Sequence, residues 1–178
     1  MSEITVRTLD EADWQVYRDI RLAALRESPE AFVATHEEES AFDESAWRLR
    51  LGRSRRLLAE RDDEALGVVS LGQGSDANAS AGELFGLWVS PAARGSGVAW
   101  RLVQAGAEQA RADGRAHLVY WVGTDNGRAV AFASSFGFRP TDTRRPMRVA
   151  SEQDGEEEMA MVLPLGDDPG SVPSSHRL

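Results

Sequence analysis

A short glycine-rich turn is the segment of this chain best suited to bind an anion. An almost continuous apolar stretch, Glu83–Val89, leads into a turn that holds Gly95 and Gly97, and a helical pattern begins at Val98. Glycine adopts positive φ and lets backbone N–H groups approach a ligand that a side chain would block. The helix start adds free N–H groups and the positive end of its dipole. The segment therefore predicts a phosphate cradle, which Arg94 reinforces.

The same glycines also fit a tight strand-to-helix turn without a ligand, and the glycines alone do not separate the two interpretations. The spacing excludes a dinucleotide-binding fingerprint, because Trp100 stands where G-x-G-x-x-G requires its third glycine. All 20 basic residues are arginines. The absence of lysine excludes a Walker phosphate loop and Schiff-base mechanisms.

Other residue types restrict the chemistry further. The chain has no cysteine, which excludes disulfides, thiolate nucleophiles and cysteine-bound metal. His36, His117 and His176 are scattered without the spacing of metal ligands, so we expect no metal site. The net charge of −9 and the pI near 4.9 argue against nucleic acid as a general partner.

Length and composition predict one soluble domain. The 178 residues are 42% hydrophobic and 28% charged, which is enough to build a core. The longest uncharged stretch, residues 65–75, is shorter than the roughly 20 apolar residues that span a bilayer. The N-terminus lacks the pattern of a secretory signal. We expect a cytoplasmic protein without membrane contact, a domain over residues 1–165 and a flexible tail over residues 166–178.

The elements that must position the turn follow from periodicity and turn signals. Strands are predicted over 4–7, 57–60, 66–71, 83–89, 118–122, 147–150 and 157–163. Helices are predicted over 11–27, 44–51 and 98–113, with a last helix that Thr124 or Asp125 caps. Asp154-Gly155 marks a hairpin turn between the last two strands. The order predicts an α/β domain with a mixed sheet of about seven strands flanked by helices.

Three ordered blocks resemble the GNAT superfamily of acyl-CoA-dependent N-acetyltransferases. Arg94–Ala99 (RGSGVA) is similar to the family signature R/Q-x-x-G-x-G/A, and Leu87–Pro91 (LWVSP) to its fourth strand and the proline after it. Asn126–Phe138 resembles the family's asparagine, its last long helix and the Gly-Phe pair before the sixth strand. The blocks lie in matching elements, so the resemblance covers roughly Thr5 to Pro164.

The resemblance implies how acetyl-CoA binds. The fourth and fifth strands splay apart, and the pantetheine arm lies in the gap and pairs with the backbone of Leu87, Trp88 and Val89. The pyrophosphate contacts Arg94, Gly95, Ser96, Gly97, Val98 and Ala99. Asn126 hydrogen-bonds the pantetheine or the substrate side of the cleft. A backbone N–H near Val89 stabilises the oxyanion while an amine attacks the thioester directly.

Two residues are candidates for proton transfer. Glu83 begins the fourth strand, where family members often carry a carboxylate that helps to deprotonate the incoming ammonium; an exposed strand-end glutamate is an equally weighted interpretation. The family usually places a tyrosine, the acid for the CoA thiolate, seven residues after the asparagine, but Ala133 stands there. Tyr120, in the fifth strand near the splay, is the first substitute, and Ser134 or water are the others.

The acceptor side is less sharply defined. Glu37–Glu39 either attracts a cationic amine or forms a solvated helix start, and the pattern favours the latter. Phe32 and Trp47 either floor an acceptor pocket or pack in the core, which is the default for aromatic residues. The arginines between 48 and 56 either meet the cofactor's 3′-phosphate or, the favoured interpretation, form a solvated face or a subunit contact.

These expectations combine into an acyl-CoA-dependent N-acetyltransferase that acts on a primary amine of a small metabolite, an antibiotic or a protein N-terminus. Ala133 at the acid position also suggests an acyl-CoA-binding regulatory or structural protein on the same fold. Thioesterase activity or O-acyl transfer is a weaker alternative. The sequence leaves open the acceptor, the acyl chain and whether the protein is a homodimer.

Overall fold

Seven strands form one mixed sheet in the computed structural model, which describes residues 3–73, 80–146 and 157–166. The strands are β1 (Thr5–Leu9), β2 (Arg55–Arg61), β3 (Glu64–Gln73), β4 (Ala81–Val89), β5 (His117–Gly123), β6 (Arg139–Pro146) and β7 (Glu157–Pro164). Their order across the sheet is β1-β2-β3-β4-β5-β7-β6. Neighbouring strands are antiparallel except β4 and β5, which are parallel. The predicted mixed sheet is confirmed.

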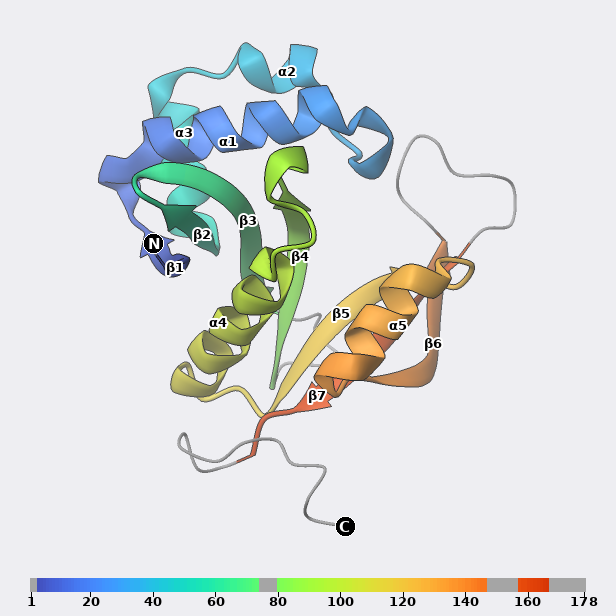
Figure 1. Ribbon diagram of the computed structural model, residues 1–178. Coiled ribbons are helices and arrows are strands. Elements are labelled where there is room, and N and C mark those ends of the chain that lie inside the picture. The colour runs from blue at the N-terminus through green and yellow to red at the C-terminus, as the bar shows by residue number, and fades with distance from the viewer. Residues whose placement is uncertain (1–2, 74–79, 147–156, 167–178) are drawn as a thin grey trace.

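Helices cover both faces of this sheet (Figure 1). They are α1 (Trp14–Glu27), α2 (His36–Ser40), α3 (Glu44–Arg53), α4 (Val98–Ala112) and α5 (Gly127–Phe136), with short 3₁₀ turns η1 (Glu11–Asp13), η2 (Pro29–Ala31) and η4 (Pro91–Ala93). Asp10 caps the first helical segment as predicted, through hydrogen bonds that form a capping box with Asp13. Within the described residues, no helix is both long and apolar enough to cross a membrane.

Alternating side chains of the central strands divide the core into two layers. Leu57 packs into the cluster that includes α4 and α5, whereas Leu58, the next residue of β2, packs into the cluster that includes α1 and α3. This alternation follows from the two-residue period of a strand. Tyr17 of α1 is buried in the second cluster, so its ring is part of the core.

The sixth strand differs from the prediction. The described part of β6 is Arg139–Pro146, a polar sequence, whereas the hydrophobic pattern predicted a strand over 147–150. That segment and the predicted turn at Asp154-Gly155 lie outside the described residues. The pattern missed β6 because it is the edge strand of the sheet. Charged side chains and prolines are common at such edges, and they hide the alternation that marks a buried strand.

A glycine brings α4 close to β4. A Cβ added at Gly106 would lie 2.8 Å from Cδ2 of the fully buried Leu84. Glycine at this position therefore lets the helix lie directly on the strand that precedes it. The close contact holds the start of α4 in a defined position relative to the end of β4.

Candidate functional site

The parallel strands β4 and β5 separate halfway along their length. They are paired from Ala81–His117 to Leu84–Tyr120, and no pairing follows beyond this point. Figure 1 shows the two strands in contact at their N-terminal ends and diverging toward the layer of α1 and α2. The predicted splay is confirmed. The facing edges beyond Leu84 and Tyr120 carry backbone groups that a ligand rich in amides can pair with.

A bulge interrupts β4 shortly after Leu84, the last residue that is paired with β5. Val68 of β3 is opposite Trp88 and Ser70 is opposite Phe85, so β4 has one extra residue there. Gly86 has φ +65°, a conformation that favours glycine. The bulge bends β4 where it leaves β5. The bulge was not expected from the sequence, although a glycine inside an apolar strand is a signal for one.

The glycine-rich turn, which the sequence predicts to be a phosphate cradle, lies directly before α4. Gly95 and Gly97 have φ +84° and +86°, and a Cβ added at either would meet nothing within 4 Å. In the described structure, the N–H groups of Gly97, Val98 and Ala99 donate no hydrogen bond. Free N–H groups at the N-terminus of a fifteen-residue helix are suited to hold phosphate oxygens.

Arg94 is oriented by two contacts. Its Nε donates to the Val89 carbonyl at 2.9 Å, and its Nη2 donates to Glu27 Oε1 at 2.7 Å. Glu27 ends α1 and also accepts from Trp88 Nε1 at 3.1 Å and from the Ser28 hydroxyl. Hydrogen bonds from Ser28, Arg94 and Trp88 hold the pKa of Glu27 below its ordinary value. Glu27 was not expected from the sequence, because Trp88 and Arg94, which connect it to the site, are more than 60 positions away.

The other predicted cofactor residues surround this turn and the split. Leu87 lies half-buried beside the bulge, while Trp88 is buried and points toward α1. The Ser96 hydroxyl donates to the Ala93 carbonyl and tightens the turn. Asn126 caps α5, since its Oδ1 accepts from the Ala129 N–H at 3.1 Å. The expectation that Thr124 or Asp125 caps this helix is wrong. A capping side chain accepts from the N–H two or three residues after it, and the residue three positions before Ala129 is Asn126.

A cleft of about 750 Å³ opens beside the split. Its lining comes from α1, α2, α3 and the segment 31–34 on one side and from β4, β5, β6 and β7 on the other. Glu83 and Tyr120, the two candidates for proton transfer, both line it. Tyr120 is in the last pair, with Leu84, and Glu83 is in the pair before it, so the cleft meets the split where β4 and β5 part.

Glu83 and Tyr120 have different surroundings in this cleft. Trp121 Nε1 donates to Glu83 Oε1 at 3.3 Å, and Glu83 forms no ion pair with the described residues. Tyr120 packs against Phe138, with ring centroids 6.0 Å apart. Burial raises the pKa of Tyr120 above 10.0. A phenol of this kind keeps its proton at neutral pH and can donate it.

One residue of the acidic run is buried, contrary to the expected solvated helix start. Glu37 and Glu38 are exposed, and Glu38 closes a capping box with Thr35. Glu39, however, is 1% exposed and accepts hydrogen bonds from Arg21 at 2.8 and 3.1 Å and from Arg50 at 3.0 Å. Two guanidinium groups make burial of this carboxylate tolerable.

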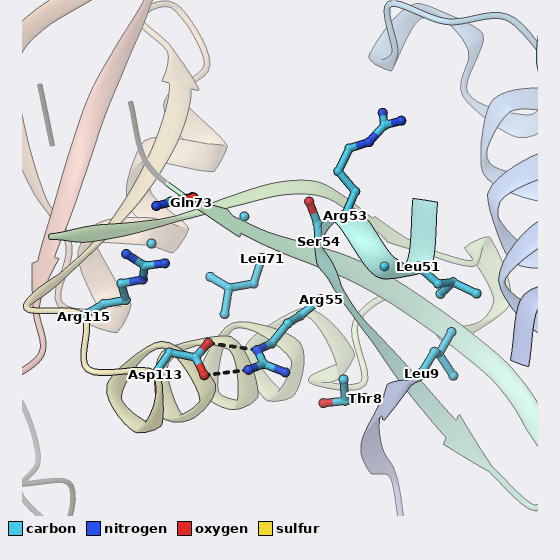
Figure 2. A pocket seen from close by; sticks show the side chains of 13 residues that line it. Thr8, Leu9, Leu51, Arg53, Ser54, Arg55, Leu71, Gln73, Asp113 and Arg115 are labelled. Carbon is cyan, nitrogen blue, oxygen red and sulfur yellow. Dashed lines mark hydrogen bonds and ion pairs between the residues drawn. The ribbon is translucent and has the colours of Figure 1, made fainter. Parts of the chain in front are cut away.

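The aromatic and arginine candidates for the acceptor and phosphate sites lie in different parts of the molecule. Phe32 lines the cleft, whereas Trp47 is fully buried in the core. Figure 2 shows a second hollow, of about 410 Å³, in which Arg55 pairs with Asp113 through two hydrogen bonds of 2.8 Å. Asp113 follows the C-terminal end of α4, so this hollow lies at the opposite end of that helix from the cradle. Arg55 is therefore not placed to reach the cradle.

The fold and the site define a class of protein before any comparison. A split parallel strand pair beside a phosphate-ready helix start provides room for a long ligand that has amides along its length and phosphates at one end. The sequence pattern of the acetyltransferase (GNAT) family matches residues 16–138. The chain belongs to this family, which confirms the resemblance.

Solved structures of acetyltransferases have the same fold. They include yncA from Salmonella typhimurium, a putative acetyltransferase with its cofactor acetyl-CoA (TM-score 0.69, 23% identity, 97% of this chain and 98% of that chain). A GNAT acetyltransferase from Streptococcus pneumoniae has a TM-score of 0.73 and 17% identity over 92% of this chain and 100% of its own. The ribosomal-protein-S18-alanine N-acetyltransferase from Escherichia coli has a TM-score of 0.65 and 19% identity over 92% and 94%. Comparison with curated proteins gives no significant match.

Proposed function

We propose that the protein transfers the acetyl group of acetyl-CoA to a primary amine. The observation that carries this proposal is the separation of β4 from β5 after Leu84 and Tyr120, directly beside the glycine-bearing start of α4. The separation exposes strand edges for the pantetheine amides, and the helix start binds phosphate oxygens.

The residues present fit this acyl donor. Open space next to Gly95 and Gly97 leaves the N–H groups of the turn accessible, and Arg94 keeps N–H groups beyond those that bind Val89 and Glu27. The pyrophosphate binds to the segment Arg94–Ala99. The backbone of Leu87–Val89 pairs with the pantetheine arm, and the amide nitrogen of Asn126, which its capping bond does not use, donates to the same arm.

Glu83 and Tyr120 supply the proton transfers. Glu83 accepts a proton from the substrate ammonium, and the amine nitrogen attacks the thioester carbonyl carbon. A backbone N–H near Val89 stabilises the oxyanion. The carbon–sulfur bond then breaks, the nitrogen passes its second proton to solvent water, and Tyr120 donates a proton to the CoA sulfur and is reprotonated from solvent. The products are an N-acetylated amine and CoA, and no covalent enzyme intermediate forms.

Substitution of Gly97 tests the cofactor cradle. Gly97→Glu places a carboxylate where the pyrophosphate binds, so we expect acetyl-CoA binding, measured by calorimetry, to be lost while the circular dichroism spectrum is kept. Gly114→Glu is the matched control, since Gly114 lies beyond the other end of α4, has φ +81° and also has open space around it. Both variants carry the same backbone strain. Unchanged affinity in folded Gly97→Glu would exclude the cradle as the phosphate site.

An acyl-CoA-binding protein without turnover is the second candidate. It is favoured by Ala133, which is fully buried where the family usually carries its tyrosine. Release of free thiol from acetyl-CoA across a panel of amines distinguishes the two. Amine-dependent release supports the transferase, whereas tight CoA binding without release supports the binding protein.

A further inference from the structure

The helical side of the cleft holds two arginines around one buried carboxylate. Arg21 of α1 and Arg50 of α3 both bind the buried Glu39 of α2, with nitrogen–oxygen distances of 2.8 and 3.0 Å. Two positive charges face one negative charge, which leaves a net charge of +1 in this cluster. All three residues line the cleft, and the two arginine side chains are 18% and 23% exposed.

Both arginines have N–H groups to spare. A guanidinium carries five N–H groups in a planar fork. Arg21 uses its Nε and Nη2 on Glu39, and Arg50 uses its Nη2. The remaining N–H groups can bind a second carboxylate, because the guanidinium fork matches that planar group.

A third arginine, Arg56, is buried close to the cleft. Arg56 is 6% exposed and forms no ion pair with the described residues; its N–H groups bind the Ser70 hydroxyl and the Arg50 carbonyl. Its guanidinium carbon is 5.5 Å from the ring centroid of Phe85, which lines the cleft. A buried charge is weakly screened, so Arg56 adds to the positive potential on this side.

The strand side of the cleft has the opposite character. Glu158 is neutralised by Arg145, with a nitrogen–oxygen distance of 2.6 Å, so Glu83 is the carboxylate that remains available on this side. Glu38 lines the helical side and keeps its negative charge, but its carboxylate is exposed and accepts hydrogen bonds from the Thr35 N–H and hydroxyl at the start of α2. The cleft therefore has one side for an anion and one side for a cation.

We propose that the acceptor is a small amino acid-like molecule that carries a carboxylate as well as its amine. The carboxylate binds Arg21 and Arg50, and the amine lies toward Glu83 and receives the acetyl group. The net charge of +1 on the cluster of Arg21, Arg50 and Glu39 is balanced by one carboxylate. A peptide N-terminus lacks this carboxylate next to its amine. The inference rests on the proposed N-acetyltransferase activity.

Matched pairs of acceptors test the inference on the unmodified protein. Thiol release from acetyl-CoA is measured with the common L-amino acids, with their carboxamides and with the corresponding amines that lack the carboxyl group. Amines of carboxamides are less basic and more fully deprotonated at neutral pH, so intrinsic reactivity favours the carboxamides. We expect at least one amino acid to exceed its carboxamide in kcat/KM by roughly 10- to 100-fold, the effect of a charged hydrogen bond.

The outcomes separate the inference from the activity on which it rests. Equal or faster turnover of carboxamides or carboxyl-free amines overturns the inference and leaves N-acetyl transfer intact. The carboxamide arm also represents a peptide N-terminus. No release with any amine overturns both.

Variants then test the assignment to the arginine pair. Arg50→Gln should raise KM for the amino acid roughly 10-fold or more and leave acetyl-CoA binding unchanged. It should also reduce the difference in kcat/KM between the amino acid and its carboxamide. Arg50→Lys keeps the charge but loses the planar guanidinium fork, so it should show a smaller change of the same kind. This second variant keeps the test informative if Arg50→Gln does not fold. Arg48→Gln is the control, since Arg48 lies on α3, pairs with Glu44 and does not line the cleft. An unchanged preference for the carboxylate in both Arg50 variants overturns the assignment.

Discussion

Glu83 and Tyr120 show how the function proposed here depends on single residues. Both lie within the last two pairs of β4 and β5 and line the same cleft. Glu83 has a carboxylate that accepts one hydrogen bond from Trp121, and Tyr120 has a phenol that burial keeps protonated. One can accept a proton and the other can donate one, which is the pair of transfers that amide formation requires.

Substitution of Glu83 should remove the base. Glu83→Gln keeps the shape of the side chain, so we expect turnover at neutral pH to fall about 10²–10⁴-fold, with partial recovery at high pH where the substrate amine is already deprotonated. The pH dependence of kcat/KM measures this. Glu108→Gln on the exposed face of α4 is the control. A Glu83→Gln protein with the activity profile of the unmodified protein would make the carboxylate structural.

Substitution of Tyr120 should remove the acid. Tyr120→Phe keeps the ring packing against Phe138, so acetyl-CoA binding should hold while kcat falls, the pattern of a contact made chiefly in the transition state. Because burial raises the pKa of Tyr120 above its ordinary value, the phenol keeps its proton through the neutral and mildly alkaline range, and the difference between the two proteins should persist across that range. Full activity of Tyr120→Phe on a confirmed acceptor would show that water or Ser134 protonates the thiolate. Restoring a tyrosine at Ala133 is a poor test, because Ala133 is fully buried.

At the scale of elements, Glu39 holds three helices together. It lies on α2 and binds Arg21 of α1 and Arg50 of α3. Burial raises the pKa of Glu39, but its hydrogen bonds to both arginines and their charges outweigh burial and keep the pKa below 4.5. A lowered pKa means that the unfolded chain binds protons more readily. The stabilisation is therefore complete above about pH 4.5 and is lost as the pH falls through the lower, folded-state pKa.

Glu39→Gln tests this clamp. We expect it to lower the free energy of unfolding by about 2–3 kcal/mol at pH 7, because two arginines lose their buried partner while remaining partly solvated. Its stability should also decline less steeply below about pH 4.5 than that of the unmodified protein. Urea denaturation at a series of pH values measures both effects. Glu37→Gln on the exposed side of α2 should change stability by less than about 0.5 kcal/mol, and an equal loss in both variants would contradict the clamp.

At the scale of the whole molecule, four residue pairs join two halves of the sheet. The β1–β4 half and the β5–β6–β7 half meet only through the pairs from Ala81–His117 to Leu84–Tyr120 in the described sheet. A ligand bound along the open edges of β4 and β5 would connect both halves. Its binding free energy then adds to the stability of the fold.

Hydrogen exchange tests this connection. Saturating acetyl-CoA should raise the free energy of unfolding by about 2.7 kcal/mol at 100 times its Kd and slow exchange of the amides in 85–89 and 121–123. Adenosine 3′,5′-bisphosphate, which has phosphates but no pantetheine arm, should protect the start of α4 without protecting the strand edges. Protection of the strand edges by this compound, or none by acetyl-CoA, would contradict binding in the split.

The local sequence determined much of this protein because the signals are local. The alternating and helical patterns, with the cap at Asp10, place most elements, and Gly95 and Gly97 before an apolar helix mark the turn that we propose as the cradle. The polar edge strand β6 was not predicted, because its pairing with β7, and not a hydrophobic pattern, makes it a strand. Only the tertiary structure decided which side chains meet: Glu27 with Arg94, and Glu39 with Arg21 and Arg50. These contacts join residues 11 to 67 positions apart, and they form through tertiary packing that no local pattern records.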